Sequence, residues 1–174
     1  MNRFSPRRAL TALSDGADAV ATWTTIVTTI AFTLLIFVAV VTRYAFRVSL
    51  VFSVEISKLL FVWSAFLAAT VAYKRKAHIR FEFINMILGP RGTALTDVAL
   101  YLSAIIFFQM LFRHAIRFTR IIWRTYLPVL GLSQGWLYVA VVVSSALFFV
   151  HSSALLAQAI TDAQAAFSRD GGSA

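Results

Sequence analysis

The chain has 174 residues, of which 60% are hydrophobic, and it carries a formal net charge of +9. A soluble domain is nearer half apolar, and here the excess stands in long blocks, so the composition indicates a polytopic membrane protein. The sequence contains no cysteine, which excludes disulfides and thiol-ligated metal or haem centres. Because the basic residues flank the apolar blocks, anionic lipid headgroups are the expected partners of this charge and nucleic acid is not.

Four long apolar stretches divide the chain, and each is long enough, or nearly so, to cross a bilayer as a helix. They are Val20–Tyr44, Val48–Tyr73, Thr93–Arg113 and Trp136–Ala157. All seven glycines and all three prolines lie outside them. Transporters commonly bind substrate where Gly or Pro breaks a helix, so unbroken spans favour a scaffold over a substrate pathway. We predict an all-α membrane protein with four transmembrane helices, some of them long and tilted, forming one domain over residues 19–160.

The two ends of the chain differ from this membrane domain. Residues 1–18 are polar and basic, which predicts a short cytoplasmic segment. The first span ends in Arg43-Tyr44 with no small-residue cleavage site, so we expect a retained helix and not a removed signal peptide. Its threonines need not mark a polar path, because their hydroxyls can bond carbonyls of their own helix. Residues 161–174 are expected to form a flexible tail.

Charged residues limit the second span. Between Lys58 and Lys74 only 15 residues are uncharged, about 22 Å of helix against a hydrocarbon core of about 30 Å. Either the helix begins near Val48, which places Glu55 near one membrane interface, or the bilayer thins locally. Glu55 and Lys58 stand three residues apart, so we expect them to pair on one helix face. An acid near membrane depth is a functional candidate by default, but the position of Glu55 near the end of its span favours an ion pair or a partner contact over proton coupling.

The third span is bounded by a break and a basic stripe. Gly89-Pro90-Arg91-Gly92 predicts a chain break that follows a short surface helix, with Thr93 as the cap of the next helix. At the other end, four arginines spaced four, three and four apart share one helix face: Arg113, Arg117, Arg120 and Arg124. This pattern predicts a short amphipathic helix in the membrane interface, or a strongly tilted span, with the arginines on lipid headgroups. The alternative is a span that leaves the membrane with a solvated basic end.

The three histidines do not form a pattern typical of haem ligation. His78 lies in a basic loop, His114 lies at the end of a span, and His151 alone lies within one. No Ser-His-Asp, HExxH or phosphate-loop pattern occurs in the sequence. We therefore expect no catalytic residue, no cofactor and no metal site.

The Lys and Arg residues in the loops predict the orientation. Nine of them lie on the side that carries both termini, and seven lie on the other side. The cluster Lys74-Arg75-Lys76 belongs to the first group, so we expect both termini in the cytoplasm.

The segment around the second span is the most distinctive. An acid opens it, an apolar run with a Trp and small residues follows, and a basic stretch, a His and a second acid come next. Here the chain resembles the small membrane subunit (DctQ type) of tripartite ATP-independent periplasmic (TRAP) transporters. The resemblance covers roughly residues 20–160 and is carried by Glu55, Trp63, Ala68-Ala69, Lys74-Arg75, His78-Ile79 and Glu82. The family often has Gly where Ala68 or Ala69 stands and Asp where Glu82 stands.

The resemblance implies a non-catalytic subunit of the bacterial inner membrane. Such a subunit binds a large membrane transport subunit and enlarges its scaffold, while a periplasmic substrate-binding protein captures an organic acid whose uptake sodium drives. Candidates for structural or subunit-interface roles are Glu55, Lys58, Trp63, Arg75, His78 and Glu82. Two alternatives stay open: a membrane anchor of a redox complex, which would need haem or quinone ligands, and a small stand-alone transporter.

Overall fold

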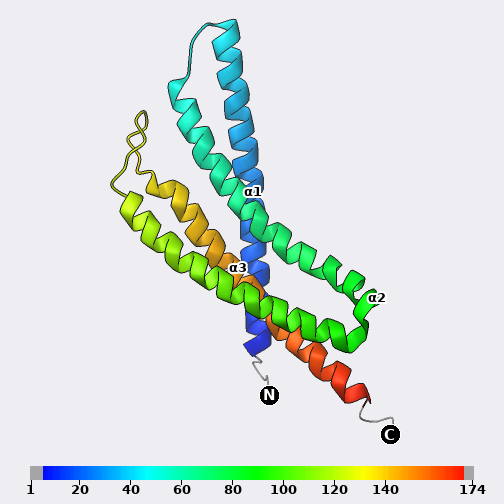
Figure 1. Ribbon diagram of the computed structural model, residues 1–174. Coiled ribbons are helices and arrows are strands. Elements are labelled where there is room, and N and C mark those ends of the chain that lie inside the picture. Colours follow the sequence, from blue (N-terminus) through cyan, green and yellow to red (C-terminus); the bar gives the residue numbers. More distant parts are fainter. Residues whose placement is uncertain (1–5, 171–174) are drawn as a thin grey trace.

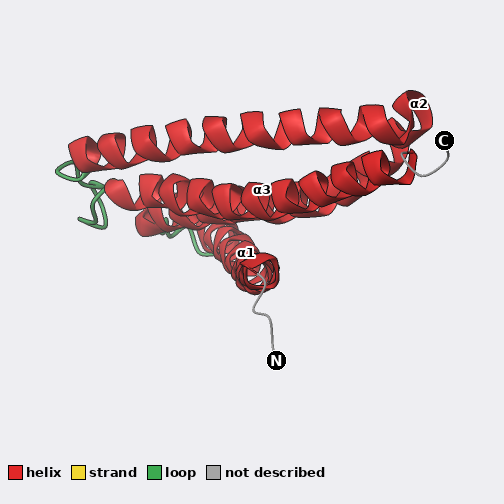
Figure 2. Ribbon diagram, turned by 90° about the horizontal axis from the view of Figure 1, so that it is seen from below, coloured by secondary structure: helices red, strands yellow, loops and turns green. Residues whose placement is uncertain are grey.

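The computed structural model describes residues 6–170, with the side chains of residues 12–75, 92–93, 95–161 and 163–164. The described chain forms three long helices, α1 (Pro6–Ala45), α2 (Val51–Ile122) and α3 (Gly135–Asp170), and contains no β-strand. Figure 1 shows both termini at one end of the molecule and the two interhelical loops toward the other end. Figure 2 shows α1 almost end-on, to one side of the other helical segments. Accordingly, α1 crosses the bundle at a steep angle.

Helix α2 supplies two of the membrane spans. Its 72 residues would form a straight rod about 108 Å long, but Figure 1 shows that the helix turns back on itself in its middle part. Four segments are long and apolar enough to cross a membrane: Ala12–Ala45, Val51–Arg75, Leu95–Ile122 and Gly135–Thr161. The prediction of an all-α membrane protein with four transmembrane helices is thus confirmed.

Two expected boundaries inside α2 are wrong. The helix does not begin anew at Thr93, because its backbone stays helical through the Gly89–Gly92 segment. Pro lacks the backbone amide hydrogen and Gly lacks a Cβ, so such a segment can bend while the helical hydrogen bonds on either side persist. The two short surface helices are likewise not separate elements. The segments that precede Gly89 and that carry Arg113–Arg120 both continue α2, since no Gly or Pro interrupts them.

The outer helices are longer than the spans within them. Helix α1 begins at Pro6. Proline suits the first helical position, because the N–H that it lacks would have no hydrogen-bond partner within the helix there. Residues 6–18 are therefore continuous with the first span as one helix. Helix α3 reaches Asp170, so the expected flexible tail is helical over residues 161–170. The second span begins at Val51, close to the expected start near Val48.

Helix α1 ends in a backbone cap. The amide of Val48 donates to the carbonyl of Thr42 at 3.1 Å, which closes the last turn. This geometry requires a left-handed residue between them, and Arg47 takes that place with φ of 57°. Along the same helix, the expected bonding of threonine hydroxyls to their own helix is confirmed at Thr28 and Thr33.

Small and polar side chains dominate the interior of the bundle. The largest fully buried side chains are His151, Thr70, Ser144, Ser145 and Ser152. Small residues let membrane helices approach closely, which replaces the hydrophobic driving force that lipid removes. Aromatic rings complete the packing, and the rings of Phe108 and Phe148 stack at 4.3 Å between α2 and α3. Helix α3 packs mostly on α2 and only lightly on α1.

Candidate functional site

The loop between α2 and α3 is a compact hairpin held by backbone and hydroxyl bonds. The amide of Leu127 donates to the carbonyl of Leu132 at 2.8 Å, and Gly131 takes the left-handed conformation between them. The Ser133 hydroxyl donates to the carbonyl of Trp123 at 2.7 Å. A Cβ at Gly135 would meet the Trp123 ring, so a larger residue at the start of α3 would displace that ring. We call residues 123–134 the α2–α3 loop.

Glu55 anchors this loop to the start of α2. Its carboxylate accepts hydrogen bonds from the amides of Val129, at 3.0 Å, and Leu130, at 2.8 Å. The side chain is buried, so the two amides satisfy a carboxylate that water does not reach. The expected ion pair with Lys58 is wrong: among the described side chains Glu55 has no basic partner, and Lys58 is exposed. The spacing of three permitted a pair, but two backbone donors from a distant loop take its place.

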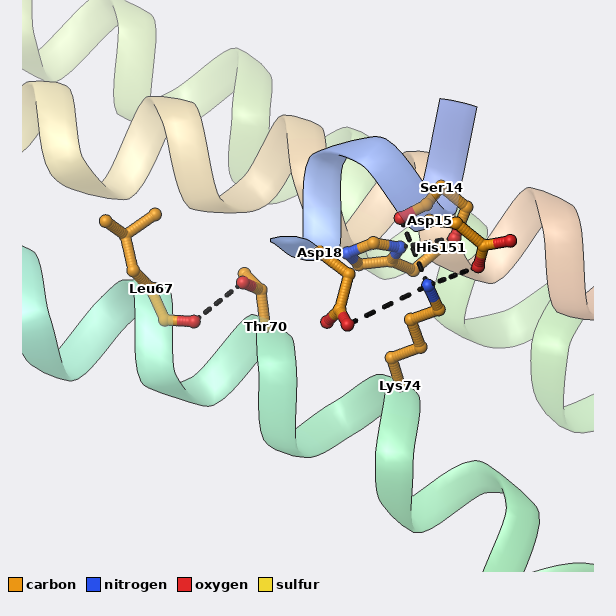
Figure 3. Close-up of polar contacts among 7 residues, drawn as sticks. All are labelled: Ser14, Asp15, Asp18, Leu67, Thr70, Lys74 and His151. Atoms are coloured by element: carbon orange, nitrogen blue, oxygen red, sulfur yellow. Dashed lines mark hydrogen bonds and ion pairs between the residues drawn. The ribbon is translucent and has the colours of Figure 1, made fainter. Parts of the chain in front are cut away.

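A second anchor joins all three helices near the other end of the same span. We call Ser14, Asp15, Asp18, Lys74 and His151 the polar cluster (Figure 3). The Lys74 ammonium lies 2.7 Å from an Asp15 oxygen and 4.0 Å from an Asp18 oxygen, and it donates to the carbonyl of Ser14 at 3.1 Å. The Ser14 hydroxyl and Nδ1 of His151 lie 2.7 Å apart. Together these bonds hold the N-terminal part of α1 against α2 and α3.

His151 is a buried titratable residue that the sequence argument left without a role. It is fully buried, and its Nε2 has no hydrogen-bond partner among the described residues. One sequence signal pointed to it, namely a titratable residue well inside a span. Its partner Ser14 had no such signal, because it lies in a stretch that the sequence placed outside the membrane domain.

The outward side of α1 carries a regular apolar stripe that was also missed. Its large side chains alternate three and four residues apart and are each 39% to 80% exposed: Val20, Trp23, Val27, Ile30, Leu34, Phe37, Val41 and Tyr44. We call this set the α1 seam. Such alternation is the spacing by which one helix packs along another. The spacing can be found in the sequence, but it does not stand out there, because the first span has apolar residues on all of its faces.

The other predicted residues are distributed over the molecule. Trp63 donates its indole hydrogen to the carbonyl of Trp136 at 3.1 Å, which ties α2 to the start of α3. Arg75 is exposed, and the side chains of His78 and Glu82 lie outside the described residues. Arg113, Arg117, Arg120 and Arg124 are all exposed along the end of α2 and into the loop that follows it.

The structure does not bring the described histidines together. The Nδ1 atom of His114 lies 2.8 Å from the carbonyl of Met110 on the exposed side of α2, whereas His151 bonds Ser14 in the interior. Among the described side chains, no group of three or more His, Asp or Glu residues could hold a metal ion. The features that stand out are therefore two polar contacts between helices, at Glu55 and in the polar cluster, and the exposed apolar face of the α1 seam.

Comparisons with known proteins agree with this architecture. Residues 32–162 match the family described as "Tripartite ATP-independent periplasmic transporters, DctQ component". A protein of Haemophilus influenzae named "Putative TRAP transporter small permease protein" is 29% identical over 114 residues, which cover 66% of this chain and 71% of that protein. No solved structure gives a significant match. The family match spans most of the chain, including Glu55, Lys74 and His151, and the chain belongs to the DctQ family, the small membrane component of TRAP transporters.

Proposed function

We propose that this chain is a non-catalytic scaffold subunit that binds the large membrane subunit of its transporter through the α1 seam. The observation that carries the proposal is the seam itself, a helical face of eight large apolar side chains that are each at least 39% exposed. Exposure alone would not indicate a partner protein, because lipid tails are as apolar as leucine and can cover the same face. The three-and-four alternation adds the geometry that suits a second helix.

The polar cluster supports this proposal. The polar cluster holds one end of α1 in place while α1 packs only lightly on α3, so its long outward face stays available. In the proposed assembly a helix of the large subunit lies along this face and the α2–α3 pair forms the static flank. The large subunit then moves an organic acid, delivered by a periplasmic substrate-binding protein, at the expense of a sodium gradient.

Photo-cross-linking tests the interface. The chain is co-expressed with the large subunit encoded beside it, with benzoylphenylalanine at Leu34 on the seam. The matched control carries the same group at Ile36, which is also exposed but points almost the opposite way, two residues along the helix. We expect cross-links to the large subunit from position 34 and few from position 36. Cross-links from position 36 alone would place the interface elsewhere.

Reconstitution tests the scaffold role. In proteoliposomes with a sodium gradient, the chain alone should take up no organic acid. Uptake should appear when the chain is reconstituted together with the large subunit and the substrate-binding protein. Saturable uptake by the chain alone would contradict the scaffold reading.

Cysteine labelling tests the proposed orientation in the bacterial inner membrane. The chain has no native cysteine, so Ala77→Cys provides a single site beside the basic cluster. With both termini in the cytoplasm, a membrane-impermeant thiol reagent should label this site only after the cells are opened. Ready labelling in intact spheroplasts would reverse the orientation.

A further inference from the structure

A hollow of about 450 Å³ lies between the end of α2 and the first part of α3. Its lining is mostly apolar and includes Ile116 from α2 with Val139 and Val142 from α3. Arg120 and Arg124 also line it. The hollow therefore joins an apolar wall to two fixed positive charges, and the proposed scaffold role makes no use of it.

The two arginines have no counter-charge within the described part of the chain. Both are exposed, and the ion pairs found among the described side chains all belong to Lys74. Neither guanidinium forms a hydrogen bond with another described residue, although each presents five donors. Thr119, which lines the same hollow, already donates its hydroxyl hydrogen to the carbonyl of Ala115 at 2.7 Å. The groups of the site that have no bond to another described residue are thus the two guanidinium groups, which are positively charged hydrogen-bond donors.

The hollow lies where two spans end. The third span ends at Ile122 and the fourth begins at Gly135. Aromatic pairs mark the same level: the rings of Trp123 and Trp136 are 5.9 Å apart, and those of Phe118 and Tyr138 are 4.8 Å apart. Trp and Tyr are enriched where hydrocarbon gives way to headgroups. The apolar wall then lies at acyl-chain depth and the arginines at phosphate depth.

We propose that this hollow is a binding site for one anionic phospholipid. An acyl chain packs on Ile116, Val139 and Val142, and the headgroup phosphate binds Arg120 and Arg124. Guanidinium groups bind phosphate through paired hydrogen bonds, which is stronger and more specific than a diffuse surface charge. Charge complementarity favours this occupant over a helix of another subunit, because a helix would leave both arginines unpaired unless it carried acids of its own.

Lipid retention measures the site directly. The full chain is purified in mixed micelles that contain equal amounts of phosphatidylglycerol and phosphatidylcholine, and bound lipid is counted by native mass spectrometry. We expect one phosphatidylglycerol to be retained in preference to phosphatidylcholine. The variant Arg120→Ala/Arg124→Ala should lower that preference roughly 10-fold or more, since even one hydrogen bond to a charged group contributes about 1.5–3 kcal/mol.

Two further variants separate a site from general attraction. Arg113→Ala/Arg117→Ala removes the same charge from the same stripe without touching the hollow, and it should keep the preference. Val142→Trp fills the hollow while all four arginines remain, and it should lose the bound lipid. Equal loss in both arginine variants, or full retention in Val142→Trp, would overturn the proposal. Helical content and elution volume are compared with the parent chain, so that only folded variants are scored.

Discussion

The first half of α2 is held at both ends by an ionisable side chain, and the two ends use opposite chemistry. Glu55 lies at the loop end and binds two backbone amides of the α2–α3 loop. Lys74 lies 19 residues further, about 28 Å along the helix, and binds carboxylate and carbonyl oxygens of α1. Glu55 is 8% exposed, whereas the side chain of Asp15 is 73% exposed. The buried Glu55 carboxylate is thus satisfied by neutral dipoles, whereas the pair of Lys74 and Asp15 lies where water reaches it.

This difference matters for reading membrane sequences. A Glu and a Lys three residues apart suggest an ion pair, yet here Glu55 and Lys58 have different surroundings and do not meet. Burying a charge pair costs desolvation of both partners, whereas amides already fixed in a tight loop lose less on binding a carboxylate. The anchors also act at separate places, so changes at the two ends should add in their effect on stability.

The largest expected effect is at the loop end. Glu55→Ala leaves the amides of Val129 and Leu130 without acceptors and should lower the free energy of unfolding by about 3 kcal/mol. Glu55→Gln should lose about half as much, because its amide oxygen can still accept. Unfolding in detergent measures the loss, and faster hydrogen exchange at residues 129 and 130 locates it. If Glu55→Ala leaves a stable, assembled complex that no longer transports, Glu55 acts in coupling.

Lys74→Ala should cost less, about 2 kcal/mol, because Asp15 remains largely in water and only Asp18 is left poorly compensated. Raising the salt concentration should shrink this cost, since screening weakens an exposed pair. The cost of Glu55→Ala should change little with salt. The same unfolding assay at low and high salt checks both, and Lys74→Arg serves as the charge-preserving control. Equal salt dependence of the two variants would remove the distinction drawn between the two ends.

Ser14→Ala tests the buried part of the polar cluster alone. It removes the hydroxyl beside Nδ1 of His151 and should lower stability by about 1–2 kcal/mol, the usual cost of a buried polar atom left unpaired. Thr33→Ala, further along α1, is the control, because its exposed hydroxyl bonds only a carbonyl of its own helix. We expect the loss to be insensitive to salt, unlike that of Lys74→Ala. A Ser14→Ala chain as stable as its parent would show that the bond to His151 contributes nothing net.

Arg47→Gly gives the smallest effect, and in the opposite direction. Arg47 holds a left-handed conformation that an L side chain adopts at a cost of about 1 kcal/mol, and glycine adopts it freely. The variant should therefore gain up to about 1 kcal/mol at the loop end. Arg43→Gly, inside α1, should lose stability by a similar amount and provides the control. A destabilised Arg47→Gly would mean that the guanidinium contributes more than the backbone costs.

The helices themselves could be predicted, but their boundaries less well. A bilayer requires about 20 apolar residues in a row, and this local property identified all four spans. The expected break at Gly89–Gly92 was wrong, because Gly and Pro show where a helix can bend and not whether it ends there. The N-terminal segment is a related case. Its polar residues suggested solvent, although Ser14 is buried against α3.

Within the site, residue types could be predicted and partners could not. The sequence by itself determined an all-α membrane protein and the family resemblance, and it singled out Glu55 and the arginine stripe as candidates, because hydropathy and spacing act over a few turns of helix. Only the tertiary structure decided that Glu55 binds a loop 74 residues away, that Lys74 reaches back 59 residues to Asp15, and that His151 meets Ser14 across 137 residues. Such bonds depend on how helices cross. The crossing is decided by the small side chains that let α1, α2 and α3 approach one another.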